Sequence, residues 1–189
     1  MKDIPEIYFK NEDEWRNWLH QNYAQKEGIY LIFYKIDHDY ESMRWEEAVQ
    51  VALCYGWIDS TVKSLGNGKR RQYFCRRKPR SVWSRVNKNY VKELTKKGLM
   101  HESGHNVIGI AKKNGSWTAL DDVENGIIPE DLQMAFDKNS TAFKNYGNFT
   151  KGQRKSYLYW LNQAKRVETR KKRITEIVQL CSENIKSRN

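Results

Sequence analysis

The feature that most constrains the fold is the run GIYLIFYKI, which begins at Gly28. It contains about seven residues that favour β-strands and is bounded by charge, so it predicts a strand buried on both faces. The preceding segment predicts a helix over residues 12–23, because Asn11 and Glu14 have the spacing of a capping box and apolar residues follow at helical intervals. The chain therefore begins with a mixture of helix and sheet.

Two further β-like segments are joined by the tetrapeptide GNGK at residues 66–69. An Asn-Gly pair between two such segments is typical of a tight hairpin, so we expect residues 57–65 to pair with residues 70–77. The tetrapeptide is not a phosphate-binding P-loop, because the second glycine is not at the required spacing and the Lys-Ser or Lys-Thr ending is absent. The expected centre of this part of the chain is a small mixed or antiparallel sheet.

Helical periodicity lies on both sides of the predicted hairpin. Ser42 is a candidate cap for a helix that ends near Gly56, and Ser81 is a candidate cap for a longer helix that stops at Gly98. Another helix is predicted over residues 102–113. After an irregular connection of about fifteen residues, every predicted element is helical: 129–137, 139–147, 150–166 and 169–186.

The order of these elements predicts the fold class and the division of the chain. The class is α+β, with a small mixed or antiparallel sheet and packed helices, followed by an all-helical C-terminal part. We place an α+β unit at residues 1–118 and a helical unit at residues 119–189. A chain of 189 residues is long enough to bury a sizeable core.

The chain is basic, with 34 Lys and Arg residues against 23 Asp and Glu residues, and the excess is unevenly distributed. Residues 63–97 contain about thirteen bases and one acid, Glu93, and residues 151–173 form a second basic block. Such a distribution attracts anionic small molecules or acidic partners, and it also predicts salt-sensitive, nonspecific binding to nucleic acid. No RNA-recognition, KH or zinc-finger motif accompanies it, so sequence-specific DNA recognition is not expected.

The apolar segments and the cysteines predict a cytoplasmic location. No stretch approaches the roughly 20 apolar residues of a membrane span, and the first residues lack the apolar core of a signal peptide. Cys54, Cys75 and Cys181 are far apart and lie in apolar or aromatic contexts, so we expect reduced thiols rather than disulfides or a zinc site. These patterns predict no cofactor and no metal.

Three long strings of unusual composition stand out: WEEAVQVALCYGWIDSTVKSL (45–65), RRKPRSVWSRVNKNYVKELTKKGLM (76–100) and IPEDLQMAF…YLYWLNQAKRVETRKKRI (128–174). In this order they resemble the YdeI/OmpD-associated family, also called bacteriocin-protection proteins, over nearly the whole chain. The resemblance implies a cytoplasmic bacterial protein associated with tolerance of antimicrobial peptides or envelope stress, and it names no reaction. It also implies, as a weaker alternative, an adaptor with an envelope-protein partner.

The string ALCYGWIDS brings together a thiol, an indole and a carboxylate. A nearby Asp59 carboxylate would raise the pKa of the Cys54 thiol rather than activate it, so Cys54 is better interpreted as a core residue. Trp57 and Asp59 are alternate residues of a predicted strand and therefore share a face, which makes them candidate pocket residues. The structural alternative is that Trp57 packs in the core while Asp59 pairs with an arginine of the partner strand.

The string HESGH at residues 101–105 matches the His-Glu-x-x-His motif of zinc peptidases. Here His101 falls at a predicted helix start, and Gly104 weakens the turn that would hold both ligands. The other histidines, His20 and His38, belong to remote predicted elements. A zinc site is therefore not expected.

The basic stretch QYFCRRKPRSVWSRVNKNY, residues 72–90, is the leading candidate for a binding site. A serine-rich helix start after a basic loop offers hydroxyls, backbone amides and the positive end of a helix dipole to an anion. Trp83 offers a flat stacking surface, and its helical spacing is equally compatible with a core position. The predicted anion site comprises Arg70, Arg71, Arg76, Arg77, Arg80, Trp83, Ser84 and Asn87, with Lys165, Arg166 and Arg170 from the C-terminal helices.

Two classes of function fit these residues. The preferred one is a non-enzymatic protein that binds an anionic ligand or an acidic partner, because no catalytic dyad with a suitable base emerges from the sequence. The competing one is an enzyme that acts on a phosphorylated or carboxylated small molecule, using Asp59 or the pair formed by His101 and Glu102.

Overall fold

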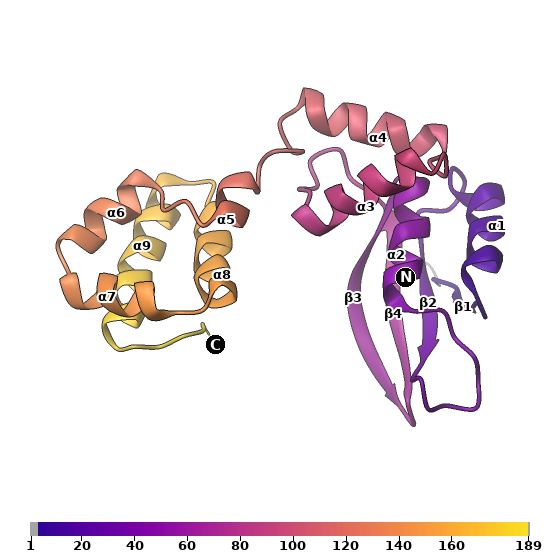
Figure 1. The fold of residues 1–189 in the computed structure, drawn as a ribbon, viewed down its shortest axis with the longest axis horizontal. Coiled ribbons are helices and arrows are strands. Elements are labelled where there is room, and N and C mark those ends of the chain that lie inside the picture. The colour runs from indigo at the N-terminus through magenta and orange to yellow at the C-terminus, as the bar shows by residue number, and fades with distance from the viewer. Residues whose placement is uncertain (1–3, 189) are drawn as a thin grey trace. The chain divides into compact units, whose positions relative to one another are not determined.

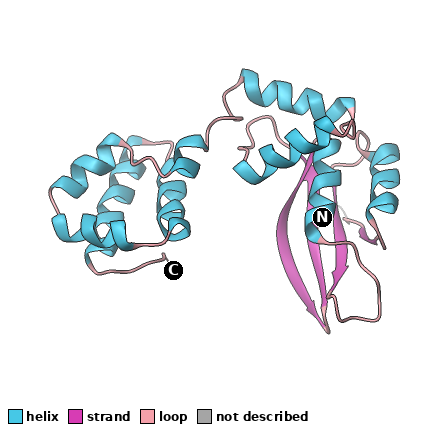
Figure 2. Ribbon diagram, in the orientation of Figure 1, coloured by secondary structure: helices cyan, strands magenta, loops and turns pink. Residues whose placement is uncertain are grey.

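The structure is a computed structural model that describes residues 4–188. The chain divides into two compact units, residues 1–118 and 119–189 (Figure 1). The first combines a sheet with helices, and the second consists of helices and loops (Figure 2). The predicted α+β class, with an all-helical C-terminal part, is confirmed.

A mixed four-stranded sheet with the strand order β1-β2-β4-β3 forms the centre of the first unit. Its strands are β1 (Glu6–Tyr8), β2 (Gly28–Tyr34), β3 (Trp57–Gly66) and β4 (Lys69–Arg76). β1 pairs with β2 in parallel, and β4 pairs with both β2 and β3 antiparallel. At the predicted hairpin, Asn67 and Gly68 have φ values of 46° and 69°, the left-handed conformation that a two-residue turn of this kind requires.

Burial of the central strand β2 differs between its two faces. Ile29, Leu31 and Phe33 are buried in the core. On the other face Ile32 is buried as well, whereas Tyr30 and Tyr34 are half-buried. The prediction that this run is buried on both faces is therefore only partly correct. Side chains of the neighbouring strands cover the second face, as the contact between the Tyr30 and Tyr73 rings at 5.2 Å illustrates.

The helices of the first unit are α1 (Glu12–Asn22), α2 (Trp45–Cys54), α3 (Arg85–Lys96) and α4 (Glu102–Lys113). Helix α2 is central, because it packs against β3 and against each of the other three helices. The core is rich in tryptophan, and two of the buried indoles donate to backbone carbonyls: Trp15 to Ala48 at 3.1 Å and Trp57 to Tyr23 at 3.2 Å. This satisfies the one polar atom that a buried indole carries.

Two predicted helix caps are wrong. Ser84, not Ser81, caps α3, and its hydroxyl accepts from the Asn87 amide at 3.2 Å. Ser42 does not cap α2, which begins only at Trp45; its hydroxyl instead accepts from the Tyr34 amide at 3.2 Å. In both cases a serine upstream of the helix satisfies the sequence rule for a cap, and tertiary packing decides where the first helical turn begins.

The second unit contains α5 (Asp121–Asn125), α6 (Glu130–Asp137), α7 (Ser140–Asn148), α8 (Lys151–Asn162) and α9 (Val167–Ser182). Helix α9 packs against α6, α7 and α8. Leu132, Phe136, Leu161, Ile177 and Cys181 are fully buried in its core. None of the helices in the described part of the chain has the length and apolarity that crossing a bilayer requires.

Candidate functional site

The neighbouring arginines of β4 point to opposite faces of the sheet. The Arg70 guanidinium lies 5.3 Å from the Phe33 ring on the core side. The Arg71 guanidinium lies over Tyr30 at 4.4 Å and is ion-paired with Glu6 on the other side. Successive residues of a strand alternate between faces, so these two predicted ligands of one anion do not share a site.

Arg77 and Trp83 form an internal pair. Arg77 is only 7% exposed and Trp83 is fully buried, with the guanidinium carbon 3.8 Å from the indole centroid. Arg77 Nη1 donates to the Val82 carbonyl at 2.9 Å, and burial lowers the pKa of Arg77 to about 10. The Trp83 ring also contacts Trp117 at 4.9 Å, so it offers no free face on which a ligand can stack.

The other predicted ligands in the first unit are dispersed. The Ser84 hydroxyl is occupied as the cap of α3, where it accepts from the Asn87 amide. Arg76 is exposed and donates to the Ala24 carbonyl at 3.4 Å, and Arg80 is exposed after the end of β4. The side chains that the sequence grouped together therefore do not form one anion site.

The predicted C-terminal ligands belong to the second unit. Lys165 and Arg166 are exposed immediately before α9. Arg170 donates a hydrogen bond of 2.8 Å to Asp131, and this pairing lowers the pKa of the Asp131 carboxyl. The charge of Arg170 is thus already balanced within its own unit.

The pocket candidates Trp57 and Asp59 are held by hydrogen bonds within the first unit. Trp57 is fully buried and donates to the Tyr23 carbonyl at 3.2 Å. Asp59 accepts from the Trp45 indole at 3.0 Å and from the Gln72 amide at 2.6 Å. The alternative in which Asp59 pairs with an arginine of the partner strand is therefore wrong in its detail, because two neutral donors hold the carboxylate.

The HESGH string begins with a helix cap. His101 precedes α4 and its Nδ1 accepts from the Ser103 amide at 3.2 Å, while its ring contacts those of Tyr23 at 4.8 Å and Tyr55 at 4.9 Å. His101 therefore lies outside the helix that carries His105. Within the described residues, no group of three or more His, Cys, Asp or Glu side chains is arranged to hold a metal ion.

All three cysteines are free thiols whose pKa values are raised by burial, that of Cys181 to about 12. Because the thiolate is the reactive form, we expect Ellman's reagent to modify the native protein at least about tenfold more slowly than the unfolded protein at pH 8. A Cys75→Ser variant isolates the two fully buried thiols and should react more slowly still. Equal rates for folded and unfolded protein would contradict this assignment.

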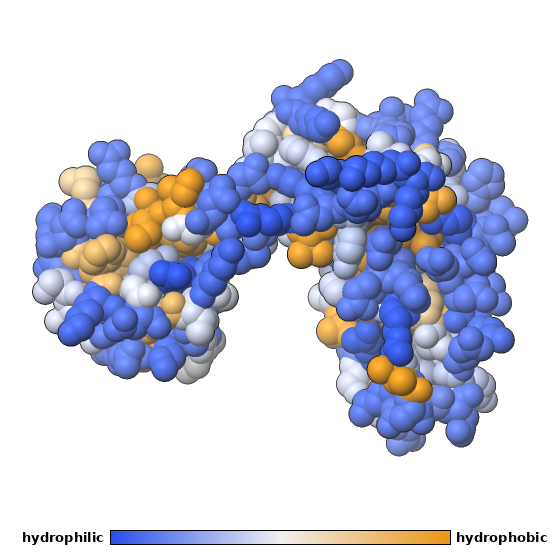
Figure 3. All heavy atoms as spheres, viewed as in Figure 1, coloured by the Kyte–Doolittle hydropathy of each residue, from blue (hydrophilic) through white to orange (hydrophobic). Residues whose placement is uncertain are grey.

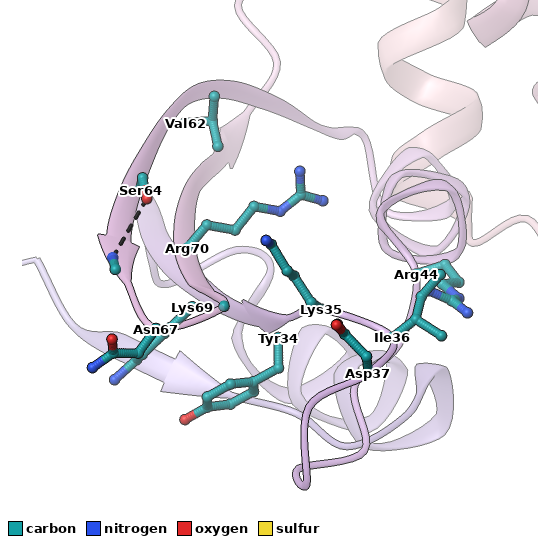
Figure 4. Close-up of a pocket in the computed structure, with 12 residues that line it drawn as sticks. Tyr34, Lys35, Ile36, Asp37, Arg44, Val62, Ser64, Asn67, Lys69 and Arg70 are labelled. Carbon is teal, nitrogen blue, oxygen red and sulfur yellow. Dashed lines mark hydrogen bonds between the residues drawn. The ribbon is translucent and has the colours of Figure 1, made fainter.

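The structure contains a basic groove that the sequence analysis missed. It lies along the hairpin of β3 and β4, has a volume of about 910 Å³, and is called the hairpin groove here (Figure 4). Its lining comes from the end of β2, the start of α2 and both hairpin strands: Tyr34, Lys35, Ile36, Asp37, Arg44, Val62, Ser64, Gly66, Asn67, Gly68, Lys69 and Arg70. Arg70 is the one predicted ligand among them.

The hairpin groove is electropositive. The side chains of Lys35 and Arg70 point toward one another into the hollow (Figure 4), and Arg44 and Lys69 add two further cations. Asp37 is the one carboxylate in the lining. In the part of the chain that the structure describes, none of the four cations forms an ion pair. Converging charges without carboxylate partners create a positive potential that attracts anions.

The shape of the hairpin groove follows from irregularities in β3. The pairing of β3 with β4 shifts register between Asp59 and Val62, and again between Ser64 and Gly66. Such bulges bend a strand and increase its twist, so the hairpin curves around the Arg70 side chain (Figure 4). The bulges carry no clear sequence pattern, which is why the periodicity of this segment did not predict the groove.

Comparison with known proteins identifies two regions. Residues 125–184 match the family model described as Bacteriocin-protection, YdeI or OmpD-Associated, which confirms the resemblance for the helical unit. Residues 7–107, which include the first two strings, match a Domain of unknown function (DUF8412). No curated protein and no solved structure matches the chain. The chain therefore belongs to the DUF8412 family, whose model covers residues 7–107, and carries a bacteriocin-protection, YdeI/OmpD-associated domain at residues 125–184.

Proposed function

We propose that this protein is a non-enzymatic member of its family that binds an anionic ligand or an acidic partner in the hairpin groove. The observation that supports the proposal is the convergence of Lys35 and Arg70 in one hollow of about 910 Å³. Both cations face the same hollow, so their attractions for a phosphate or carboxylate add. The proposed binding site therefore differs from the anion site predicted from the sequence, and Arg70 is the one side chain that the two sets share.

The lining also indicates what kind of anion would fit. Arg70 presents a planar fork that suits a two-oxygen group, and Lys35 provides a compact charge on the opposite side. Val62 is 58% exposed and Ile36 is 78% exposed, so apolar surface adjoins the charged centre. The proposed ligand therefore carries a phosphate or carboxylate next to an apolar portion.

Family membership suggests the biological setting of this binding. We place it in the cytoplasm, in tolerance of antimicrobial peptides or envelope stress, with an envelope protein as one form that an acidic partner would take. The enzymatic alternative would require Asp59 or His101, and neither residue lines the hairpin groove. Turnover of p-nitrophenyl phosphate that is lost in an Asp59→Asn variant would favour the enzyme instead.

The proposal predicts that a Lys35→Glu and Arg70→Glu double variant binds anions at least about tenfold more weakly, a loss of about 1.4 kcal/mol or more. The probes are inorganic triphosphate and a fluorescein-labelled oligoglutamate peptide, followed by calorimetry and fluorescence anisotropy. Affinity of the wild-type protein should fall as salt rises, because the contacts are between charges. The two probes distinguish a small anion from an acidic polypeptide.

A matched control separates the hairpin groove from net charge. Lys92→Glu with Lys113→Glu makes the same change in charge at two exposed positions of α3 and α4. This control should retain most of the affinity. If both double variants weaken binding equally, the protein attracts anions through its overall charge and the proposal is wrong.

A further inference from the structure

A second groove lies on the helical unit, between α6 and α9, and we call it the helical groove. It has a volume of about 730 Å³ and takes all of its lining from these two helices and the residues that adjoin them. Apolar patches interrupt the hydrophilic surface of this unit (Figure 3). The lining residues are Asp131, Met134, Ala135, Lys138, Val167, Arg170, Lys171, Ile174, Thr175 and Val178.

The lining residues form one stripe along each helix. On α9 they recur at intervals of three and four, from Val167 to Val178. At 1.5 Å per residue, this stripe extends over three turns, or roughly 16 Å. On α6 the stripe runs in the same way, from Asp131 to Lys138. Two helices that present such stripes side by side form the kind of groove in which a third amphipathic helix packs.

The floor of the helical groove is apolar and uncovered. Met134 is 57% exposed and Val167 is 67% exposed, although both side chains are apolar. Ala135 and Thr175 are small, so a helix backbone can approach closely between the larger side chains. An exposed methionine adapts its shape to a partner, which is typical of surfaces that receive apolar side chains.

The rim of the helical groove carries an excess of positive charge. Arg170 and Asp131 neutralise each other through their hydrogen-bonded ion pair. Two exposed cations remain: Lys138, which directly follows α6, and Lys171 on α9. The Lys171 ammonium lies 3.9 Å from the carboxylate of Glu168, a long and exposed ion pair. An apolar floor between two lysines is complementary to an apolar stripe flanked by carboxylates.

We propose that the helical groove binds an amphipathic helix of an acidic partner protein. In this arrangement apolar side chains at i, i+3, i+4 and i+7 of the partner lie on Met134, Val167 and Ile174, and flanking glutamates face Lys138 and Lys171. The site lies in the second unit and uses no residue of the hairpin groove. A negative result for anion binding in the hairpin groove would therefore leave this proposal unaffected, and the reverse also holds.

The test uses the full chain and lactam-stapled helical peptides of about 14 residues, which is long enough to span the stripe on α9. One peptide has leucines at i, i+3, i+4 and i+7 with glutamates beside them, the second has lysines in place of the glutamates, and the third has the acidic composition in scrambled order. By fluorescence anisotropy, the acidic amphipathic peptide should bind at least about tenfold more tightly than either of the others.

Two variants locate the binding in the helical groove. Met134→Glu places a carboxylate on the floor of the helical groove and should weaken binding of the acidic peptide at least about tenfold. The control is Ile110→Glu, an equivalent change at a 45% exposed position of the first unit, and it should leave binding of the peptide unchanged. Lys138→Glu with Lys171→Glu should reverse the preference between the acidic and the basic peptide.

Three results would overturn the proposal. The first is equal binding of the three peptides, and the second is an equal effect of Met134→Glu and Ile110→Glu. The third is a dimer in light scattering that Met134→Glu converts to monomer, because a second copy of the chain would then be the occupant of the helical groove. The first of these results is measurable even if a variant folds poorly, since the comparison of the three peptides uses the wild-type protein.

Discussion

Replacing Gly104 with alanine is expected to destabilise the N-terminal unit by about 3 kcal/mol, although alanine normally stabilises a helix relative to glycine by about 0.5–1 kcal/mol. The reason is that α4 packs directly on the end of α2. A β-carbon at Gly104 would lie 2.2 Å from the Cys54 carbonyl oxygen and 2.9 Å from Met100. The carbonyl is backbone and cannot rotate away, so the two helices must separate.

Gly109 provides the matched control within the same helix. A β-carbon at Gly109 meets no atom within 4 Å, so Gly109→Ala should stabilise the unit by the usual amount for a helix. Urea unfolding followed by tryptophan fluorescence measures both variants, because six of the seven tryptophans precede residue 119. Equal effects of the two substitutions would show that α4 does not pack on the Cys54 carbonyl.

Arg77→Glu is expected to destabilise the same unit by about 3–5 kcal/mol. The substitution buries a carboxylate where a guanidinium now stacks on Trp83 and donates to the Val82 carbonyl. It also removes a positive charge that acts on Asp59 and adds a second negative charge near it. A loss of anion binding in this variant would therefore follow from unfolding rather than from a lost contact with the ligand.

Two further substitutions test this explanation. Arg77→Met keeps the volume and removes the buried charge, so it should cost less than about 2 kcal/mol. Arg76→Glu reverses the charge of the exposed neighbour and should change stability by about 0.5 kcal/mol or less. If the Arg77→Glu variant has the same urea midpoint of unfolding as the wild-type protein and loses only anion binding, Arg77 is a ligand-binding residue and its assignment to the core is wrong.

Much of the fold was predictable because its signals are local. The Asn67-Gly68 turn and the Asn11 cap of α1 are both present in the structure. Each depends on residues only a few positions apart. The exceptions are Ser81 and Ser42, where an acceptable cap residue is present and packing of the surrounding segment chooses another start for the helix.

The candidate site was less predictable, because basic residues that are close in sequence need not be close in space. The alternation of side chains along a strand already separates Arg70 from Arg71. Burial of Arg77 against Trp83 depends in addition on Trp117, more than thirty residues away. A cluster of positive charge in the sequence predicts an electropositive protein, and it does not predict which of those charges meet.

The sequence by itself determined most of the order of helices and strands, although not β1 or α5. It also determined the tight turn of the hairpin, the basic character of the protein and its family resemblance, because these depend on composition and on neighbours along the chain. Only the tertiary structure decided that Lys35, Arg44 and Arg70 line one groove. Pairing of β2 with β4 and the position of α2 bring these three residues together. Such long-range contacts are fixed by the packing of the whole unit, so no window of the sequence contains them.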